Sequence, residues 1–220
     1  LLEKAKKYGL NNNVKQEVVF PAVNTKKFKN KKRIISFHSK KTIEILTVAR
    51  LHWIKGLDYI IEAMGKLGSV NFRYTIVGSG SEYERLVLAV NQLNLRKKVR
   101  LVGYVPHDDI VPFYEKADIY IQYSIEEGFC NAVLEAQSMG VLTVVSDASG
   151  LIENVIDGKT GWVVPKRKPT LLAKKIKQII SMENKKLNTI RLNGIERVKN
   201  KFDLSKQKKH FDSFFNENLF

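Results

Sequence analysis

Short apolar runs and amphipathic stretches alternate about six times between residues 42 and 165. The apolar runs are rich in β-branched residues, which is typical of strands buried on both faces of a sheet. The strands are expected over residues 43–48, 72–78, 99–103, 117–124, 141–146 and 161–165. Between them apolar residues recur at helical spacing, which predicts helices over residues 57–67, 81–93, 108–115, 131–139 and 150–156.

Strands that alternate with helices across short connections predict parallel strands joined by right-handed crossovers. The expected fold class is therefore α/β, with a doubly wound, Rossmann-like parallel sheet of about six strands and extra helices at the C-terminal end. Ligands on such sheets bind at the carboxyl ends of the strands, where helix N-termini point. The loops that follow strands are thus the place to look for a site.

The two ends of the chain lack this alternation. Residues 1–24 predict a helix and one strand, over the QEVVFP run at 16–21, and are too few to bury a core alone. They are interpreted as the remnant of another domain, followed by a basic linker over 25–41, a Rossmann-like domain over 42–180 and helices over 181–220. Because the sequence starts at Leu1 without Met, we expect an excised fragment.

The chain has 38 Lys and Arg against 22 Asp and Glu, a net charge of +16. The excess lies in the flanks, because residues 42–165 carry 11 basic and 15 acidic residues. Three interpretations are open: a solvated surface, attraction to an anionic membrane surface at about 1 kcal/mol per cation, or nucleic acid. The basic, amphipathic stretch 174–180 fits either a surface helix or a membrane-interface helix. No base-reading helix or stacking aromatic pair is evident, so a nucleic acid partner is not expected.

Composition further narrows the classes of protein to which this chain could belong. The 44% hydrophobic share of the 220 residues can fill the core of one domain. A single cysteine, Cys130, excludes an internal disulfide and a Cys-based zinc or iron–sulfur site, which favours a reducing compartment. No apolar run reaches the roughly 18–20 residues needed to cross a bilayer, so a membrane-spanning segment is not expected within this chain.

The loop after the first expected strand carries two cations. Arg50 ends the strand, and Lys55 and Gly56 immediately precede a helix. They are either surface residues or a clamp for a diphosphate, in which arginine offers a fork of donors, lysine a mobile charge and the helix end free N–H groups.

The loop after the fourth expected strand carries two carboxylates. Glu127 stands at the mouth of the helix and Glu135 lies in its first turns, and carboxylates there suit recognition of sugar hydroxyls. The alternative for Glu135 is a carboxylate favoured by the helix dipole. Cys130 could be read as a nucleophile, but no histidine lies beside it in the sequence to activate it.

Four ordered segments together resemble a known family: VVFPAVNTKKF, the Arg50, Lys55 and Gly56 element, EGFCNAVLEAQSMG and SDASGLIENVIDGKTGWVVP. They are similar to the C-terminal, donor-binding half of retaining GT-B glycosyltransferases of group 4, the glycosyl transferases group 1 family. The resemblance covers about residues 18–180. It departs from the family at Ser149 to Glu153, where many members have Gly-Gly-Pro-Glu.

The resemblance implies a role for each matching residue. Arg50 and Lys55 would hold the two phosphates of the donor, Glu127 the transferred sugar and Glu135 the ribose hydroxyls. Arg50, Lys55 and Glu127 would be the catalytic set. The other implied donor contacts are the loop at Gly128, Phe129, Cys130 and Asn131, Leu134 beside the ribose, and Tyr104 and Val105 at the base.

The function implied is transfer of a hexose, with retention of configuration, from a nucleotide diphosphate sugar (a UDP or GDP sugar) to a glycan or lipid-linked acceptor. The acceptor would bind the missing N-terminal domain, so this fragment would bind donor without completing transfer. No metal or other cofactor is expected, since two cations and a helix end can neutralise the leaving diphosphate. The expected location is cytoplasmic, or peripheral on the inner face of the membrane. The alternatives are a GT-B nucleotide-sugar epimerase or sugar phosphorylase, and a non-catalytic nucleotide or polyanion-binding module.

Overall fold

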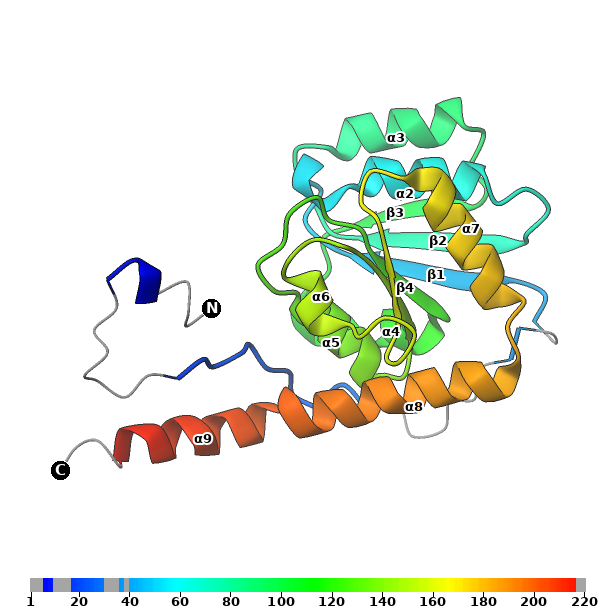
Figure 1. The fold of residues 1–220 in the computed structure, drawn as a ribbon. Helices are drawn as coiled ribbons and strands as arrows, with labels where there is room; N and C mark the ends of the chain where they lie inside the picture. Colours follow the sequence, from blue (N-terminus) through cyan, green and yellow to red (C-terminus); the bar gives the residue numbers. More distant parts are fainter. Residues whose placement is uncertain (1–5, 10–16, 30–35, 38–39, 217–220) are drawn as a thin grey trace.

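Six parallel strands form one sheet in the order β3-β2-β1-β4-β5-β6 (Figure 1). The structure is a computed structural model that describes residues 6–9, 17–29, 36–37 and 40–216. The strands are β1 (Ile43–Val48), β2 (Phe72–Val77), β3 (Val99–Gly103), β4 (Ile119–Gln122), β5 (Leu142–Ser146) and β6 (Trp162–Val164). The expected fold class, a doubly wound parallel sheet of about six strands, is confirmed.

Helices connect successive strands and cover both faces of the sheet. They are η1 (Trp53–Lys55), α2 (Leu57–Gly65), α3 (Tyr83–Gln92), η2 (His107–Asp109), α4 (Val111–Lys116), α5 (Asn131–Ser138), α6 (Leu151–Asn154), α7 (Pro169–Ile180), α8 (Asn184–Lys201) and α9 (Leu204–Asn216). The helices after residue 165 match the two or three segments expected there.

The alternation of side chains along each strand divides the apolar residues into two clusters. On β1, Ile45 packs with Ile60 of α2 and Ile176 of α7, all at most 1% exposed. The next residue, Leu46, faces the opposite side and packs in the cluster that holds Tyr114 of α4 and Val133 of α5. Burying each such aliphatic side chain contributes about 1.5–3 kcal/mol.

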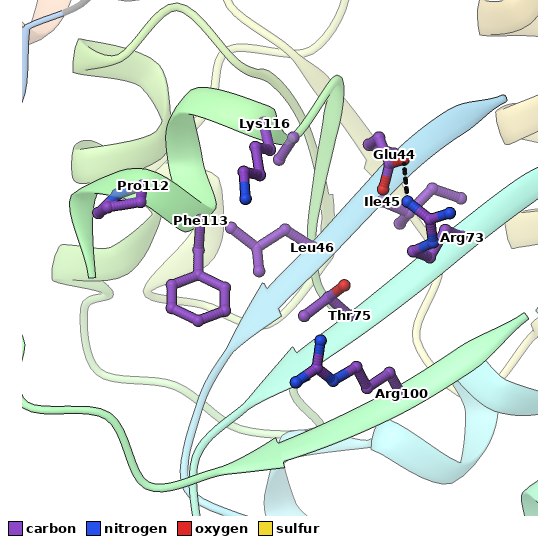
Figure 2. Close-up of a pocket in the computed structure, with 10 residues that line it drawn as sticks. Glu44, Ile45, Leu46, Arg73, Thr75, Arg100, Pro112, Phe113 and Lys116 are labelled. Atoms are coloured by element: carbon purple, nitrogen blue, oxygen red, sulfur yellow. Dashed lines mark hydrogen bonds and ion pairs between the residues drawn. The ribbon is translucent and has the colours of Figure 1, made fainter. Parts of the chain in front are cut away.

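One part of the second face is only thinly covered (Figure 2). Helix α4 has six residues, and a cavity lies between it and the first and middle parts of β1, β2 and β3. Arg73, Thr75 and Arg100 line its sheet side, and Arg73 pairs with Glu44 at 2.8 Å. This cavity lies away from the carboxyl ends of the strands.

The prediction of a strand over residues 16–21 is wrong, because the described part, 17–21, contains no strand. Further on, Val23 forms an isolated bridge with Asp203 at the junction of α8 and α9. Its N–H donates to Phe202 O at 2.8 Å, and its carbonyl accepts from Leu204 N at 3.0 Å. A helix junction offers these two groups only, whereas a strand requires a ladder of partners.

Of the C-terminal helices, α7 and α8 pack on the body of the domain, whereas α9 continues beyond the sheet (Figure 1). Most of the helix expected near the N-terminus lies outside the described residues, as do residues 217–220. The division of the chain at residues 24, 41 and 180 stays a prediction. No helix within the described ranges has the length and apolar character needed to span a bilayer.

Candidate functional site

The first half of the site is built by the connection from β1 to α2. Arg50 follows the strand, and Lys55 ends the short helix η1. Gly56 then turns the chain into α2 with a φ of 60°. A Cβ at Gly56 would lie 2.3 Å from the carbonyl oxygen of Tyr123, so only glycine lets this turn lie so close to the end of β4.

This close approach brings Lys55 to Glu127. The Nζ of Lys55 lies 2.7 Å from Oε2 of Glu127, and the two side chains are 15% and 11% exposed. The hydroxyl of Ser124 donates to the same oxygen at 3.0 Å. Because both charges are largely shielded from water, each is stabilised by the other.

An open cavity of about 620 Å³ lies beside this ion pair. Its lining includes Arg50, Lys55, Glu127 and Gly128, together with Ile54, Glu126 and Ser149. The structure therefore brings both expected cations and the first expected carboxylate to one place. The volume is in the range that ligand sites occupy, roughly 300–1,000 Å³.

Two helices begin next to this cavity. Gly56, which has no side chain, precedes α2, and Cys130, whose side chain makes no capping hydrogen bond, precedes α5. Helix N-termini of this kind attract anions through their free N–H groups and their dipole. The site thus combines two cationic side chains with two helix ends.

A series of hydrogen bonds between buried polar side chains leads to Glu127. The Tyr120 hydroxyl donates to Oε1 of Gln122 at 2.9 Å, and Nε2 of Gln122 donates to the Ser124 hydroxyl at 2.9 Å. Ser124 then donates to Glu127. Sequence analysis missed these residues, although Gln122 and Ser124 interrupt an otherwise apolar strand and buried polar side chains call for an explanation.

The second carboxylate, Glu135, is held elsewhere. It is 6% exposed, and it is not among the residues that line the cavity beside Lys55. Its Oε2 accepts from the Tyr114 hydroxyl at 2.7 Å, and its Oε1 lies 2.7 Å from Nε2 of His107. Both partners come from the segment after β3 and were missed by sequence analysis, since nothing in their spacing from Glu135 marks them.

Residues 28–197 match the family model described as glycosyl transferases group 1. The chain belongs to the group 1 glycosyl transferases. It is 28% identical over 170 residues to the capsular polysaccharide biosynthesis glycosyltransferase CapM of Staphylococcus aureus, covering 77% of this chain and 44% of CapM. The chain spans less than half the length of the curated relatives it matches.

Solved structures show the same fold. Sucrose-phosphate synthase of Thermosynechococcus elongatus superposes with a TM-score of 0.85 at 23% identity, over 98% of this chain and 56% of that one. Anabaena Alr3699/HepE, solved in complex with UDP, superposes with a TM-score of 0.81 at 21% identity, over 91% of this chain and 57% of HepE. The chain therefore has the fold of part of these GT-B enzymes, about the 56–57% of each neighbour that it covers.

The remaining expected donor contacts of this family member are placed as follows. Tyr104, after β3, is 74% exposed, and Val105 beside it is partly buried. Leu134 is fully buried in the core, and the ring of Phe129 lies 5.6 Å from that of Phe202. Asn131 is exposed at the start of α5. The side chains of Leu134 and Phe129 thus pack inward, and the roles of all these residues toward a donor stay predictions.

Cys130 has the properties of a packing residue. It is 8% exposed, and its N–H donates to Oδ1 of Asn154 at 3.1 Å. Burial raises the pKa of its thiol to about 12, with the nearby Glu127 carboxylate adding to the rise. Since the thiolate is the reactive form, Cys130 is not set up as a nucleophile.

The acidic and histidine side chains of the described residues do not gather around a metal position. No group of three or more His, Cys, Asp or Glu residues within these ranges is arranged to hold a metal ion. The positive charge at the cavity comes from Arg50 and Lys55.

Proposed function

We propose that this chain is the donor-binding part of a hexosyltransferase that takes its sugar from a nucleoside diphosphate, with retention of configuration. The observation that carries the proposal is the convergence of Arg50, Lys55 and Glu127 on one cavity beside the N-terminus of α5. Membership of the glycosyl transferases group 1 family supplies the reaction class.

The cations would act on the leaving diphosphate. Arg50 offers two parallel donors to phosphate oxygens, while Lys55 and the helix ends stabilise the charge that develops as the glycosidic bond breaks. In the free protein Lys55 is paired with Glu127. An incoming diphosphate competes for Lys55, and Glu127 is then released to accept hydrogen bonds from the hydroxyls of the sugar.

The nucleoside would lie toward the segment after β3. Glu135 would accept from the ribose hydroxyls, with Leu134 packed behind it. Tyr104 and Val105 would hold the base chiefly through their main chain, and the loop at Gly128, Phe129, Cys130 and Asn131 would meet the sugar and the phosphates. A UDP sugar is favoured over a GDP sugar because the structural neighbour HepE has been solved with UDP and with UDP-glucose.

No metal is invoked in this proposal. Two cationic side chains beside two helix ends can offset the charge of a leaving diphosphate, which is the task that a divalent cation performs in other transferases. Turnover that is unchanged by a chelator would support this part, and turnover that is abolished by a chelator and restored by Mg²⁺ or Mn²⁺ would overturn it.

The decisive experiment is a titration of this chain with UDP, GDP, ADP and inorganic pyrophosphate at rising salt. A donor site binds one nucleoside diphosphate in preference to the others and keeps much of that preference in high salt. Arg50→Ala should weaken binding about tenfold or more, because it removes charge-assisted hydrogen bonds to phosphate. Equal binding of every anion, lost together as salt rises, would instead indicate a polyanion-binding module.

The acceptor would be a glycan or a lipid-linked sugar, bound by a further domain of the full-length protein, which would work in the cytoplasm or on the inner face of the membrane. Support comes from the basic flanks and from the relative CapM, named for capsular polysaccharide biosynthesis. Flotation with liposomes tests the membrane part: recovery that depends on anionic lipid supports it, and equal recovery on neutral liposomes overturns it.

A further inference from the structure

The carboxylate of Glu135 is fixed by two donors from a different part of the chain. Tyr114 lies in α4, and His107 begins η2, which lies between β3 and α4. Each binds one of the two oxygens, at 2.7 Å in both cases. A carboxylate has about four positions for accepting hydrogen bonds, so one position on each oxygen stays open.

Tyr114 is suited to act as a permanent donor. It is fully buried, and its ring packs against Phe28 and Tyr120, each with ring centroids 5.9 Å away. Burial raises the pKa of the Tyr114 phenol well above its ordinary value, and Tyr120 and Glu135 add to this. The phenol therefore stays protonated near neutral pH and donates to Glu135, which fixes the position of Oε2.

His107 is held in place by the segment that precedes β1. Nζ of Lys27 donates to the carbonyl of His107 at 3.0 Å and pairs with Asp108 at 2.6 Å. The imidazole lies with its centroid 5.4 Å from the ring of Phe28. Its side chain is 63% exposed, so His107 stands at the surface between solvent and the nearly buried carboxylate.

We propose that Tyr114 and His107 are positioning residues that make Glu135 a selective receptor for two adjacent hydroxyls. With one acceptor position on each oxygen occupied, the two open positions can bind the vicinal 2′- and 3′-hydroxyls of a ribose. Selection of a ribonucleotide then depends on Tyr114 and His107 as well as on Glu135. This inference rests on the proposed function, because it assumes that a nucleoside diphosphate binds this site.

The test compares a ribonucleotide with its analogue that lacks both hydroxyls. The probes are whichever of UDP, GDP and ADP the chain binds most tightly and the 2′,3′-dideoxy form of the same nucleotide, titrated by calorimetry. We expect the unaltered chain to prefer the ribonucleotide on the order of 100-fold, since two hydrogen bonds to a charged group are lost with the analogue.

Tyr114→Phe and His107→Ala should each weaken binding of the ribonucleotide about tenfold, as the carboxylate loses one constraint. Binding of the dideoxy form should change little, so the preference falls. His107→Gln, which keeps an N–H donor, should restore part of it. The matched control is Tyr74→Phe, which removes another fully buried hydroxyl, bonded to Thr47 at 2.9 Å, on the opposite face of the sheet. It should leave the preference intact.

The outcomes separate this inference from the proposed function. If the chain binds a nucleoside diphosphate but Tyr114→Phe and His107→Ala keep the full preference, the positioning role is wrong and the donor site stands. If the two variants weaken binding of both probes by the same factor, the residues are merely structural. If no nucleoside diphosphate binds the unaltered chain, both proposals fall. If Tyr114→Phe does not fold, the preference measured for His107→Ala decides the test, because His107 is exposed.

Discussion

Glu127 and Glu135 lie eight residues apart in the sequence and are held in different ways. Glu127 stands in the loop before α5 and bonds through one oxygen to Lys55 and Ser124. Glu135 lies within α5 and has a different donor on each oxygen. In the proposed function an anionic ligand would take over the charge of Lys55 from Glu127, whereas Glu135 would keep both of its partners. The first carboxylate would then exchange partners and the second would hold its orientation.

The largest effect on activity is expected at Lys55, whose partner would change from Glu127 to the diphosphate. Lys55→Ala should lower kcat/KM for sugar transfer by the full-length protein about 100- to 1,000-fold. The variant lacks the cation that would stabilise the leaving diphosphate, and it leaves Glu127 without its ion-pair partner. The control is Lys66→Ala, since Lys66 is an exposed lysine paired with Glu62 on the surface of α2. Turnover near normal in Lys55→Ala would remove the basis for the clamp.

The loop that carries Glu127 depends on close backbone packing at Gly150. Its N–H donates to Glu127 O at 2.9 Å, and a Cβ at Gly150 would lie 2.1 Å from Gly128 O. Gly150→Ala should therefore reduce the free energy of unfolding by about 3 kcal/mol, measured in urea.

Gly128→Ala is the matched comparison for this loop. No heavy atom lies within 4 Å of the position that a Cβ would take at Gly128, so the expected change in unfolding free energy is about 0.5 kcal/mol or less. Equal losses in the two variants would show that the packing of the loop does not distinguish these positions.

Conversion of each carboxylate to an amide should lower the stability of the protein by different amounts. Glu135→Gln places an amide between two donors, leaving one of them without an acceptor at a cost of about 2 kcal/mol. Glu127→Gln should cost about 1 kcal/mol or less, because Lys55 and Ser124 both bind the same oxygen and an amide oxygen can serve both. Chemical denaturation measures both, and a larger loss for Glu127→Gln would reverse the comparison.

A pH-dependent effect is expected at Cys130, which lies between the two carboxylates in the sequence. Its folded thiol has a pKa raised to about 12, above the value of about 8.5 for a free thiol. The neutral thiol is favoured in the folded state, so its contribution to stability is complete below about pH 8.5 and is lost as the pH rises toward 12.

Between pH 8 and 10 the unaltered chain should therefore lose on the order of 1 kcal/mol more unfolding free energy than Cys130→Ala. Parallel urea titrations of the two chains at each pH measure the difference. Identical pH dependence would mean that the thiol is less buried than its position at the start of α5 implies.

The fold could be predicted because its signals are local and repeated. Each buried strand is a β-branched run, and each helix carries its own apolar stripe, so the order of elements followed from periodicity. The strand expected over 16–21 failed for the opposite reason. Its apolar residues satisfy the local pattern, but a strand needs a partner, and the described structure places Val23 against a helix junction instead.

The residues of the site likewise fall into those that could be predicted from the sequence and those that could not. Arg50, Lys55 and Glu127 could be predicted because each lies in a loop after a strand, and parallel strands bring such loops to one edge. Tyr114 and His107 could not, since their contact with Glu135 depends on how α4 packs against α5. The buried chain through Gln122 lies between these cases: its polar residues were visible in the sequence, but their common target was not.

The position of β3 at the edge of the sheet has a consequence for how copies of this chain behave together. Strand β3 ends the sheet, and edge strands invite pairing with another chain. Arg96, Lys97 and Arg100 are exposed around β3, so two molecules approaching along this edge would bring like charges together. The same positive charge that lines the open face thus guards against uncontrolled growth of the sheet from one molecule into the next.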